Sequence, residues 1–277
     1  MDLVVASPTG LCFGVRRAIE RLEGALAEYG TVHSLGSPIH NPQEVARLAG
    51  LGLRLIERAS LMPQGEVAFV RAHGVTRAEL EELKKRSRLV IDGTCPHVSV
   101  AQERAQSLFR EGYKVVIVGD SNHPEVRGIL GYIDGESLVI SGESEIDEKS
   151  RQKRLGILSQ TTQKESSFAS AVSKLVLIAS EIKVYNTICG ATIERQKSIQ
   201  RLAPQVDGII VIGGKNSANT RKLVEIAESL GVPAMWIEHS GELSRGWLEG
   251  KRSIGVAAGG STPDWLIKDL RFKLQTL

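Results

Sequence analysis

Three cysteines, Cys12, Cys95 and Cys189, are the side chains of this sequence with the widest range of chemistry. A cysteine can ligate a metal, act as a nucleophile or lie buried as a small apolar residue. The three are separated by 83 and 94 residues, unlike the close cysteine pairs of zinc ribbons or bacterial ferredoxins. Three thiols also cannot all pair with one another as disulfides. Their placement in the fold therefore decides their role.

An internal repeat places the cysteines in corresponding positions. Each cysteine lies near the end of an extended or apolar stretch, and a helical pattern follows it. The residue 28 positions further on is His40, His123 or Ser217, and a glycine precedes each of these by four residues. The glycines are Gly36, Gly119 and Gly213. The spacing indicates three copies of one unit.

Each copy continues with further strands and polar turns. Another strand-like run follows, and after a variable loop a last strand leads into His73-Gly74, Thr161-Thr162 or Gly259-Gly260-Ser261. The runs before the loop are 53–56, 137–140 and 234–237. Alternating strands and helices predict an α/β fold with parallel sheets flanked by helices.

The repeat predicts three pseudo-threefold-related units, at 1–95, 96–189 and 190–277, with the N-terminal strand able to pack with a neighbouring unit. Functional groups of open α/β sheets collect at the carboxyl ends of the strands, where the singled-out residues lie. If the units pack about a threefold axis, the three cysteines meet at one point inside a ring of polar residues. The polar stretch 142–154 is expected to be a solvated connection.

Composition excludes several other classes of protein. The chain has 277 residues, of which 42% are hydrophobic and 24% charged, as in ordinary globular domains. The net charge of +3 is spread along the chain, so no polybasic arm or acidic tail favours nucleic acid or a membrane surface. The N-terminus resembles no signal peptide, and no apolar window is long enough to span a membrane. We therefore expect a cytoplasmic protein.

Three convergent thiolates permit more than one kind of site. They can hold zinc together with a fourth ligand, or three corners of a cubane iron-sulfur cluster whose fourth iron stays open to a substrate oxygen. A three-cysteine zinc hydrolase, a non-catalytic repeat protein with buried cysteines, and another threefold iron-sulfur enzyme such as a quinolinate synthase-like dehydratase remain alternatives. Brown protein with about four irons would select the cluster, and colourless protein with one zinc the hydrolase.

A family resemblance extends over nearly the whole chain. The motifs that carry it are Gly10-Leu11-Cys12-Phe13-Gly14-Val15, Ile39-His40-Asn41-Pro42, Arg71-Ala72-His73-Gly74-Val75, Gly93-Thr94-Cys95-Pro96, His123-Pro124-Glu125-Val126-Arg127-Gly128, Ser159-Gln160-Thr161-Thr162, Cys189-Gly190-Ala191-Thr192, Lys215-Asn216-Ser217-Ala218-Asn219 and Gly259-Gly260-Ser261-Thr262-Pro263-Asp264. With these motifs in this order, the chain resembles the 4-hydroxy-3-methylbut-2-enyl diphosphate reductases, the terminal enzymes of the methylerythritol phosphate route to isoprenoids.

The resemblance implies a monomeric trefoil around a central 4Fe-4S cluster held by Cys12, Cys95 and Cys189. It implies reduction of the allylic alcohol diphosphate with two electrons and two protons to isopentenyl and dimethylallyl diphosphates, with loss of water. No nucleotide or flavin fingerprint is present, and Lys215 lacks the spacing of a phosphate-binding loop. An external one-electron carrier is therefore expected as a partner, and the resemblance implies a ferredoxin or flavodoxin.

The resemblance also assigns roles to individual residues. The substrate diphosphate is expected to bind a set of imidazoles, hydroxyls and one carboxamide, namely His40, His73, His123, Ser217, Asn219 and Ser261. Glu125 is expected to supply the proton that turns the substrate hydroxyl into water, directly or through Thr161, which holds the substrate alcohol. Thr192 is expected to join this relay.

Two positions depart from the family pattern. Ala218 stands where the family commonly has a second serine, and Phe13 stands where a small residue often follows the first cysteine. The first change removes one hydroxyl contact to the diphosphate or replaces it by a backbone N–H. The second is expected to affect packing near the cluster.

Overall fold

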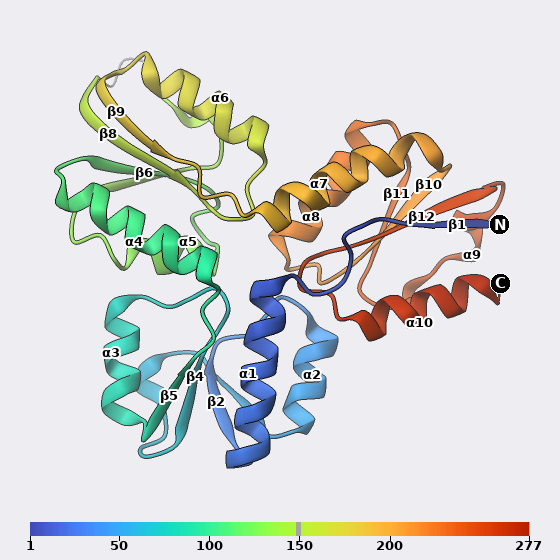
Figure 1. Ribbon diagram of the computed structural model, residues 1–277, viewed down its shortest axis with the longest axis horizontal. Helices are drawn as coiled ribbons and strands as arrows, with labels where there is room; N and C mark the ends of the chain where they lie inside the picture. Colours follow the sequence, from blue (N-terminus) through green and yellow to red (C-terminus); the bar gives the residue numbers. More distant parts are fainter. Residues whose placement is uncertain (148–150, 277) are drawn as a thin grey trace. The chain divides into compact units, whose positions relative to one another are not determined.

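Strands and helices alternate along the chain in the computed structural model, which describes residues 1–147 and 151–276 (Figure 1). The strands are β1 (Asp2–Val5), β2 (Val32–Leu35), β3 (Leu53–Ile56), β4 (Val67–Val70), β5 (Leu89–Asp92), β6 (Lys114–Val118), β7 (Ser137–Ile140), β8 (Gln152–Ser159), β9 (Ala179–Tyr185), β10 (Gly208–Ile212), β11 (Ala234–Ile237) and β12 (Ser253–Ala258). The α-helices are α1 (Phe13–Tyr29), α2 (Pro42–Gly50), α3 (Arg77–Arg86), α4 (Pro96–Arg110), α5 (Pro124–Leu130), α6 (Glu165–Val176), α7 (Gly190–Leu202), α8 (Ala218–Ser229), α9 (Arg245–Leu248) and α10 (Asp264–Gln275). Short 3₁₀ turns are η1 (Ala59–Leu61), η2 (Glu143–Glu145), η3 (Ala203–Gln205) and η4 (Ser240–Glu242).

The strands form three four-stranded sheets, and every pairing between neighbouring strands is parallel. The strand orders are β1-β12-β10-β11, β3-β2-β4-β5 and β7-β6-β8-β9. The predicted α/β class, with parallel sheets flanked by helices, is confirmed. The division of the chain into repeats at 1–95, 96–189 and 190–277 stays a prediction.

Two compact units make up the chain. The first unit contains Met1–Arg16, Ile39–Gly50 and the chain from Gly190 onward, and the second contains Arg17–Pro38 and Leu51–Cys189. The sheet built on β10 and β12 belongs to the first unit, and the other two sheets belong to the second. Strand β1 pairs with β12, so the N-terminal strand completes the sheet made by the C-terminal strands.

The first unit buries its sheet between two apolar layers. Ile209 and Val211 on one face of β10 belong to a core cluster with Leu223 of α8 and residues of α7. Ile210 of the same strand belongs to a second cluster, with Leu266 and other residues of α10 on the opposite face. Figure 1 shows α7 and α8 on one side of these strands and α10 on the other. All five residues of β10 are buried, as expected for a parallel strand covered on both faces.

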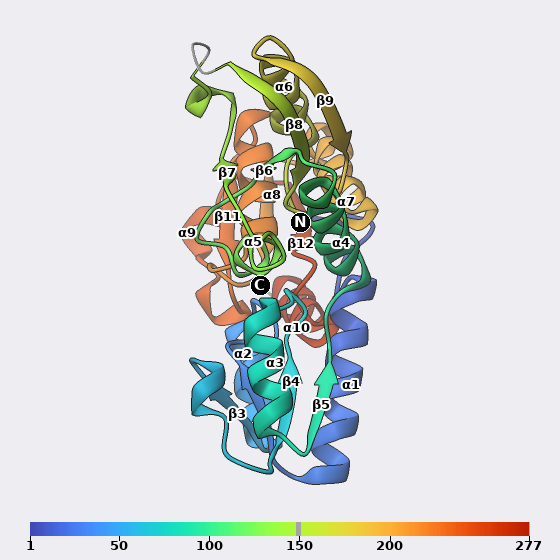
Figure 2. The ribbon, with the colours of Figure 1, turned by 90° about the vertical axis from the view of Figure 1, so that its left-hand side faces the viewer.

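The two sheets of the second unit also pack against helices. Leu108 of α4 and Ile129 of α5 lie in one cluster with Val115 and Ile117 of β6. Leu83 of α3 packs in another cluster with residues of β2 and β4. Helix α3 lies alongside β5, as Figures 1 and 2 both show. Apolar burial of this kind is the main stabilising contribution in each layer.

Local sequence signals explain where several helices begin. Thr76 accepts a hydrogen bond from the backbone N–H of Glu79, whose side chain in turn accepts from the Thr76 N–H, which completes a capping box before α3. Proline is the first residue of α4 and of α5, where its missing N–H costs no helical hydrogen bond.

The same glycine hydrogen bond recurs in all three sheets. The glycine that follows β2, β6 or β10 donates its N–H to the carbonyl of the last isoleucine in the adjacent strand. The pairs are Gly36 with Ile56 at 2.8 Å, Gly119 with Ile140 at 2.8 Å and Gly213 with Ile237 at 2.9 Å. Gly36 has a φ of +69°, which favours glycine. These bonds show that the repeat in the sequence corresponds to a repeat in backbone structure.

Only part of the predicted connection 142–154 is irregular. Its first residues form η2, and strand β8 already begins at Gln152, so the prediction of a loop is wrong for 152–154. Residues 148–150 of that prediction lie outside the described residues. Among the helices described, none is long and apolar enough to cross a membrane.

Candidate functional site

Each cysteine immediately precedes a helix and donates its backbone N–H to a turn that follows another strand of the same sheet. The helices are α1, α4 and α7. The hydrogen bonds run from Cys12 to the Gly260 carbonyl at 2.9 Å, from Cys95 to that of Ala72 at 3.0 Å and from Cys189 to that of Thr161 at 3.0 Å. The cysteines are partly exposed and form no disulfide. Each thiol therefore lies at a helix N-terminus, beside a turn that carries a predicted site residue.

These hydrogen bonds refine the alignment of the three copies. They make Thr161 equivalent to Ala72 and Gly260, because each accepts the cysteine N–H. Thr162 then corresponds to His73 and Ser261, which are the next residues along. The sequence alone placed Thr161 and Thr162 together, without showing which of them matches the histidine.

Two of the predicted anion-binding histidines are in contact in the second unit. The rings of His73 and His123 lie edge to face, with centroids 5.6 Å apart and planes inclined by 85°. His123 caps α5, because its Nδ1 accepts the backbone N–H of Glu125 at 3.2 Å. In a neutral imidazole with an accepting Nδ1, the proton sits on Nε2. The Nε2–H of His123 is therefore a hydrogen-bond donor.

Glu125 and Thr161 are joined by two short hydrogen bonds. The Thr161 hydroxyl donates to Glu125 Oε2 at 2.8 Å, and the Thr161 backbone N–H donates to Oε1 at 2.6 Å. Glu125 is 2% exposed and Thr161 5% exposed. Since the Thr161 carbonyl also accepts the Cys189 N–H, one residue links the predicted proton donor to a cysteine turn. We call this arrangement the Glu125–Thr161 corner.

Gln160, which sequence reasoning left without a role, organises the same corner. Its Oε1 accepts the backbone N–H of Asp120 at 3.1 Å, and its Nε2 donates to the Thr162 hydroxyl at 2.9 Å. The side chain is 1% exposed. Gln160 thereby ties the turn after β6 to the turn after β8. Its position beside the two threonines was a usable signal, because a buried amide needs partners on both atoms.

In the first unit the structure brings His40, Ser261 and the turn after β10 together. The Ser261 hydroxyl donates to the His40 carbonyl at 3.1 Å. A Cβ on Gly214 would lie 2.4 Å from that carbonyl oxygen, so only glycine permits this approach. Asn41 caps α2 by accepting the backbone N–H of Glu44 at 2.9 Å.

The predicted Ser217 and Asn219 lie at the start of α8. Ser217 caps the helix, because its hydroxyl accepts the Thr220 N–H at 3.3 Å. Asn219 is 9% exposed, and its Oδ1 is buried with no hydrogen-bond partner among the described residues. A buried polar atom of this kind marks a place where a further polar group can bind. Ala218 between them is partly buried.

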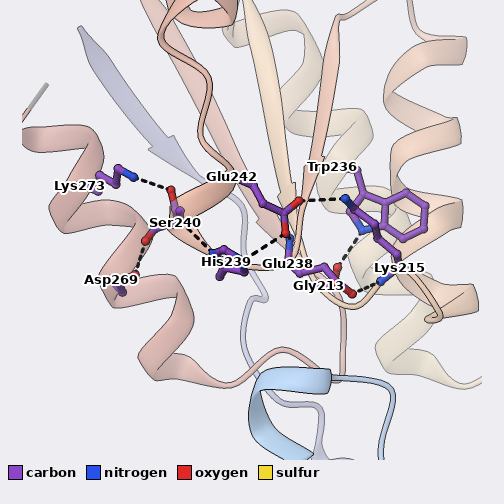
Figure 3. Close-up of polar contacts among 10 residues, drawn as sticks. Gly213, Lys215, Trp236, Glu238, His239, Ser240, Glu242, Asp269 and Lys273 are labelled. Atoms are coloured by element: carbon purple, nitrogen blue, oxygen red, sulfur yellow. Dashed lines mark hydrogen bonds and ion pairs between the residues drawn. The ribbon is translucent and has the colours of Figure 1, made fainter. Parts of the chain in front are cut away.

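An exposed polar network holds the loop from Gly213 to Ser217 (Figure 3). The Lys215 backbone N–H donates to Glu238 at 2.7 Å, and Lys215 Nζ donates to Glu242 at 2.9 Å. Trp236 Nε1 donates to the Gly213 carbonyl at 2.8 Å. Lys215 therefore contacts carboxylates in its own unit, as expected for a residue without a phosphate-loop motif.

Lys215 and Glu242 shift each other's pKa in the directions expected for an ion pair. Burial raises the pKa of Glu242, but the hydrogen bonds from Lys215 and from the Glu238 N–H outweigh this effect and leave the pKa below its usual range. The hydrogen bond to Glu242 raises the pKa of Lys215. His239 Nε2 lies 3.6 Å from Glu242 Oε1, and the His239 side chain is 47% exposed.

The remaining predicted residues are placed as follows. Thr192 is buried on α7, three residues after Cys189. Phe13 begins α1 with 68% of its surface exposed. Across residues 1–147 and 151–276, no group of three or more His, Cys, Asp or Glu side chains is close enough to hold a metal ion.

The cysteines and the polar side chains lie at the ends of parallel strands. Ligand-binding and catalytic α/β proteins commonly place their functional groups there. The LytB protein family matches residues 3–275, and the chain belongs to that family. It is 43% identical to 4-hydroxy-3-methylbut-2-enyl diphosphate reductase of Aquifex aeolicus, over 100% of this chain and 97% of that protein. It is 42% identical to the reductase of the same name from Geobacter sulfurreducens, over 99% and 97% of the two chains.

Solved structures give the same result. The structure of an (E)-4-hydroxy-3-methyl-but-2-enyl diphosphate reductase, described as the terminal enzyme of the non-mevalonate pathway, matches with a TM-score of 0.73 at 43% identity and covers 100% of both chains. The Plasmodium falciparum E-1-hydroxy-2-methyl-but-2-enyl-4-diphosphate reductase matches with a TM-score of 0.90 at 27% identity, over 100% of this chain and 87% of that one. The predicted family resemblance is confirmed, and the chain is an enzyme of the oxidoreductase class.

The donor set fits the iron-sulfur cluster that the family implies. Three thiols without disulfide partners are the soft ligands that iron-sulfur clusters prefer. Each lies at a helix N-terminus, where the peptide dipoles favour negative charge. Beside Cys12, Gly260 leaves space: a Cβ there would lie 3.6 Å from the sulfur. Cys12 belongs to the first unit, and Cys95 and Cys189 belong to the second.

Proposed function

We propose that this chain reduces 4-hydroxy-3-methylbut-2-enyl diphosphate to isopentenyl and dimethylallyl diphosphates, with loss of water. Cys12, Cys95 and Cys189 would hold a 4Fe-4S cluster, which when bound supplies electrons one at a time to the allylic alcohol. The observation that supports this most strongly is the repeated backbone hydrogen bond, which places each thiol at a helix N-terminus beside a polar turn. Family membership and the names of the relatives agree with it.

Binding of the diphosphate is assigned to neutral and polar groups. His73 and His123 present two adjacent imidazoles in the second unit, and the first unit contributes His40 together with hydroxyl and amide groups. The latter groups belong to Ser217, Asn219 and Ser261. Hydrogen bonds to a charged oxygen are stronger than those between neutral groups, so several such donors can replace a lysine clamp. The N-terminus of α8 adds further N–H groups with a favourable dipole.

Protonation of the leaving hydroxyl is assigned to the Glu125–Thr161 corner. The Thr161 hydroxyl donates to an ionised Glu125. With Glu125 protonated the bonds would reverse: the carboxyl would donate to Thr161 Oγ1, and the Thr161 hydroxyl would donate to the oxygen of the substrate alcohol and so pass a proton to the leaving group. The backbone N–H bond to Oε1 fixes the carboxyl without using the relay oxygen. Thr192, buried near the start of α7, would extend the relay.

Electrons would come from an external one-electron donor of the ferredoxin or flavodoxin type. The chain would act as a monomer, with its three repeats arranged as a trefoil about the cluster. The substrate that is reduced would be a small-molecule diphosphate.

Anaerobic purification with metal and sulfide analysis tests the proposal. We expect brown protein with about four irons and four sulfides per chain. Cys12→Ser, Cys95→Ser and Cys189→Ser should each lose most of this iron, because the cluster would keep only two protein ligands. His97→Ala is the matched control: the residue is exposed on α4, two positions after Cys95, and the variant should keep the full cluster.

Two results would contradict the proposed function. Colourless protein with one zinc per chain would favour a zinc hydrolase. A cysteine variant that retains its full cluster and normal turnover would show that its thiol is not a ligand.

A further inference from the structure

Arg195 of α7 is a buried guanidinium within the first unit. The residue is 4% exposed, although arginine is seldom buried to this extent without compensating contacts. A guanidinium stays charged at any ordinary pH, and burying it is costly unless its N–H groups are hydrogen-bonded. A guanidinium buried at this position is therefore expected to have a structural or functional role.

The guanidinium holds the loop that carries Cys12. Arg195 Nη2 donates to the Gly10 carbonyl at 2.8 Å, two residues before the cysteine, and Nη1 donates to the Ala191 carbonyl at 3.2 Å on its own helix. Gly10 has a φ of +80°, and a Cβ there would lie 2.0 Å from Asp264 Oδ1. The loop thus has a glycine-specific conformation, and the buried Arg195 side chain binds it to α7.

The guanidinium also lies close to the sulfur. A single point, where a Cβ of Gly260 would be, is 3.6 Å from Cys12 Sγ and 3.8 Å from Arg195 Nε. The Gly260 carbonyl accepts the Cys12 N–H, so the backbone of Cys12 is fixed beside this point. A permanent positive charge that is itself nearly inaccessible to solvent therefore borders the same point as the sulfur of the partly exposed Cys12.

The second unit contains similar contacts from arginines to the backbone before a cysteine, but these arginines are less buried. Arg17 Nη1 donates to the Thr94 carbonyl at 3.1 Å, one residue before Cys95, and Arg21 Nη1 donates to that of Asp92 at 2.7 Å. Both arginines lie on α1, where Arg17 is half-buried and Arg21 exposed. Arginine donation to the carbonyls before a cysteine thus recurs, but only Arg195 combines it with nearly complete burial.

We propose that Arg195 is a positioning residue for Cys12, and that its buried charge favours retention and reduction of an anionic group bound to that sulfur. The inference rests on the proposed function, because that group is the cluster. Outer-shell contacts to ligands commonly change metal affinity by about 10- to 100-fold when they are removed. A nearby positive charge also favours the reduced, more negative state of a cluster.

Three variants test this. Arg195→Met keeps the apolar stem and removes the charge, and Arg195→Lys keeps the charge but loses the planar fork. Arg201→Met is the matched control, because Arg201 lies on the same helix and donates to the Ser7 carbonyl at 3.2 Å, yet its side chain is 56% exposed. The readouts are the rate of iron loss to a chelator and the midpoint potential of the cluster, both measured anaerobically.

We expect Arg195→Met to lose iron about 10- to 100-fold faster than the wild type and to have a more negative midpoint potential. Arg195→Lys should lose iron faster but keep a potential close to that of the wild type. Arg201→Met should match the wild type in both. If Arg195→Met does not fold, Arg195→Lys alone still tests the inference, because this variant should lose iron faster while its midpoint potential stays close to that of the wild type.

Three outcomes would overturn the inference. Equal iron loss and potential in wild type and Arg195→Met would show that the charge has no influence on the cluster. Equal shifts in Arg195→Met and Arg201→Met would indicate a general effect of positive charge on α7. A wild-type chain without any cluster would overturn the proposed function itself, and with it this inference.

Discussion

The Glu125–Thr161 corner of the second unit and the Gly213–Ser217 loop of the first unit hold predicted site residues in contrasting ways. In the corner, a carboxyl that is 2% exposed accepts two short hydrogen bonds from one threonine. The loop depends instead on Lys215 and Glu242, whose side chains are 56% and 28% exposed. The corner is therefore shielded from solvent, and the loop is held at the surface.

This difference bears on how each region can work. Buried hydrogen bonds to a carboxyl are little affected by salt, and breaking one leaves a polar group unsatisfied. Exposed ion pairs are screened and contribute little each. A buried corner suits a group that must hold and move a proton in a fixed geometry. A surface-held loop suits a segment that only has to present a helix N-terminus to an anion.

The largest expected effect is that of Glu125→Gln. The amide keeps the shape and part of the hydrogen bonding but cannot supply a proton. We expect turnover to fall by roughly a hundredfold to ten-thousandfold, with a much smaller change in the Michaelis constant. Single-turnover reduction with a chemical electron donor is the measurement, because it removes slow electron delivery from the rate.

Glu44→Gln is a matched control for that experiment. Glu44 is also 2% exposed and lies in the first turn of its helix, where it pairs with Arg47 and accepts the Trp265 indole N–H at 2.9 Å. Its substitution should lower stability and leave the single-turnover rate near that of the wild type. A Glu125→Gln enzyme with an intact cluster and a wild-type single-turnover rate would remove Glu125 from the mechanism.

The next effect concerns anion binding at His123 and His40. His123→Asn retains a side chain that caps α5 well but removes the Nε2–H donor. Each lost hydrogen bond to a charged oxygen costs about 1.5 to 3 kcal/mol, so we expect His123→Asn and His40→Ala to weaken binding roughly 10- to 150-fold. Calorimetry with substrate and with inorganic diphosphate should show parallel losses. Unchanged diphosphate affinity in both variants would place the anion elsewhere.

Sequence alone predicts the backbone frame well, because its signals are local. The predicted strand-like runs 53–56, 137–140 and 234–237 are β3, β7 and β11, and the recurrent glycine directly follows β2, β6 or β10. The placement of β1 beside β12 could only be raised as an option, since strand pairing is a long-range property.

Side-chain positioning was much less predictable. Nothing in the spacing shows that Thr161 accepts the Cys189 N–H, or that Gln160 bridges two turns. Arg195 resembles any arginine of an amphipathic helix until its burial is known. Roles that depend on contacts between distant parts of the chain therefore require the folded structure.

A smaller effect is expected for Lys215→Met, which breaks the ion pair that holds the Gly213–Ser217 loop. Surface pairs contribute little, so diphosphate binding should weaken by no more than about fivefold, and the difference should shrink at high salt. Because the pKa of Glu242 is lowered, its carboxyl stays charged until the pH falls below the usual carboxyl range. The raised pKa of Lys215 keeps its ammonium group charged at high pH, so the ion pair persists between these limits. The weakening of diphosphate binding in Lys215→Met should therefore be constant between about pH 6 and pH 9. A large, salt-independent loss would mean that Lys215 contacts the anion itself.

The smallest effect is expected at Ala218, the first residue of α8. Ala218→Ser adds the hydroxyl that the family pattern commonly has there, next to the cap residue Ser217. Serine is tolerated at helix starts, and the site is only partly buried, so stability should change by less than about 0.5 kcal/mol. If the loop presents its helix N-terminus to the diphosphate, the added hydroxyl should leave binding unchanged or tighten it slightly, as measured by calorimetry against Ser217→Ala. Clear weakening by Ala218→Ser would show that the start of α8 is too tightly packed to admit the anion, and that the first unit binds it through His40 and Ser261 alone.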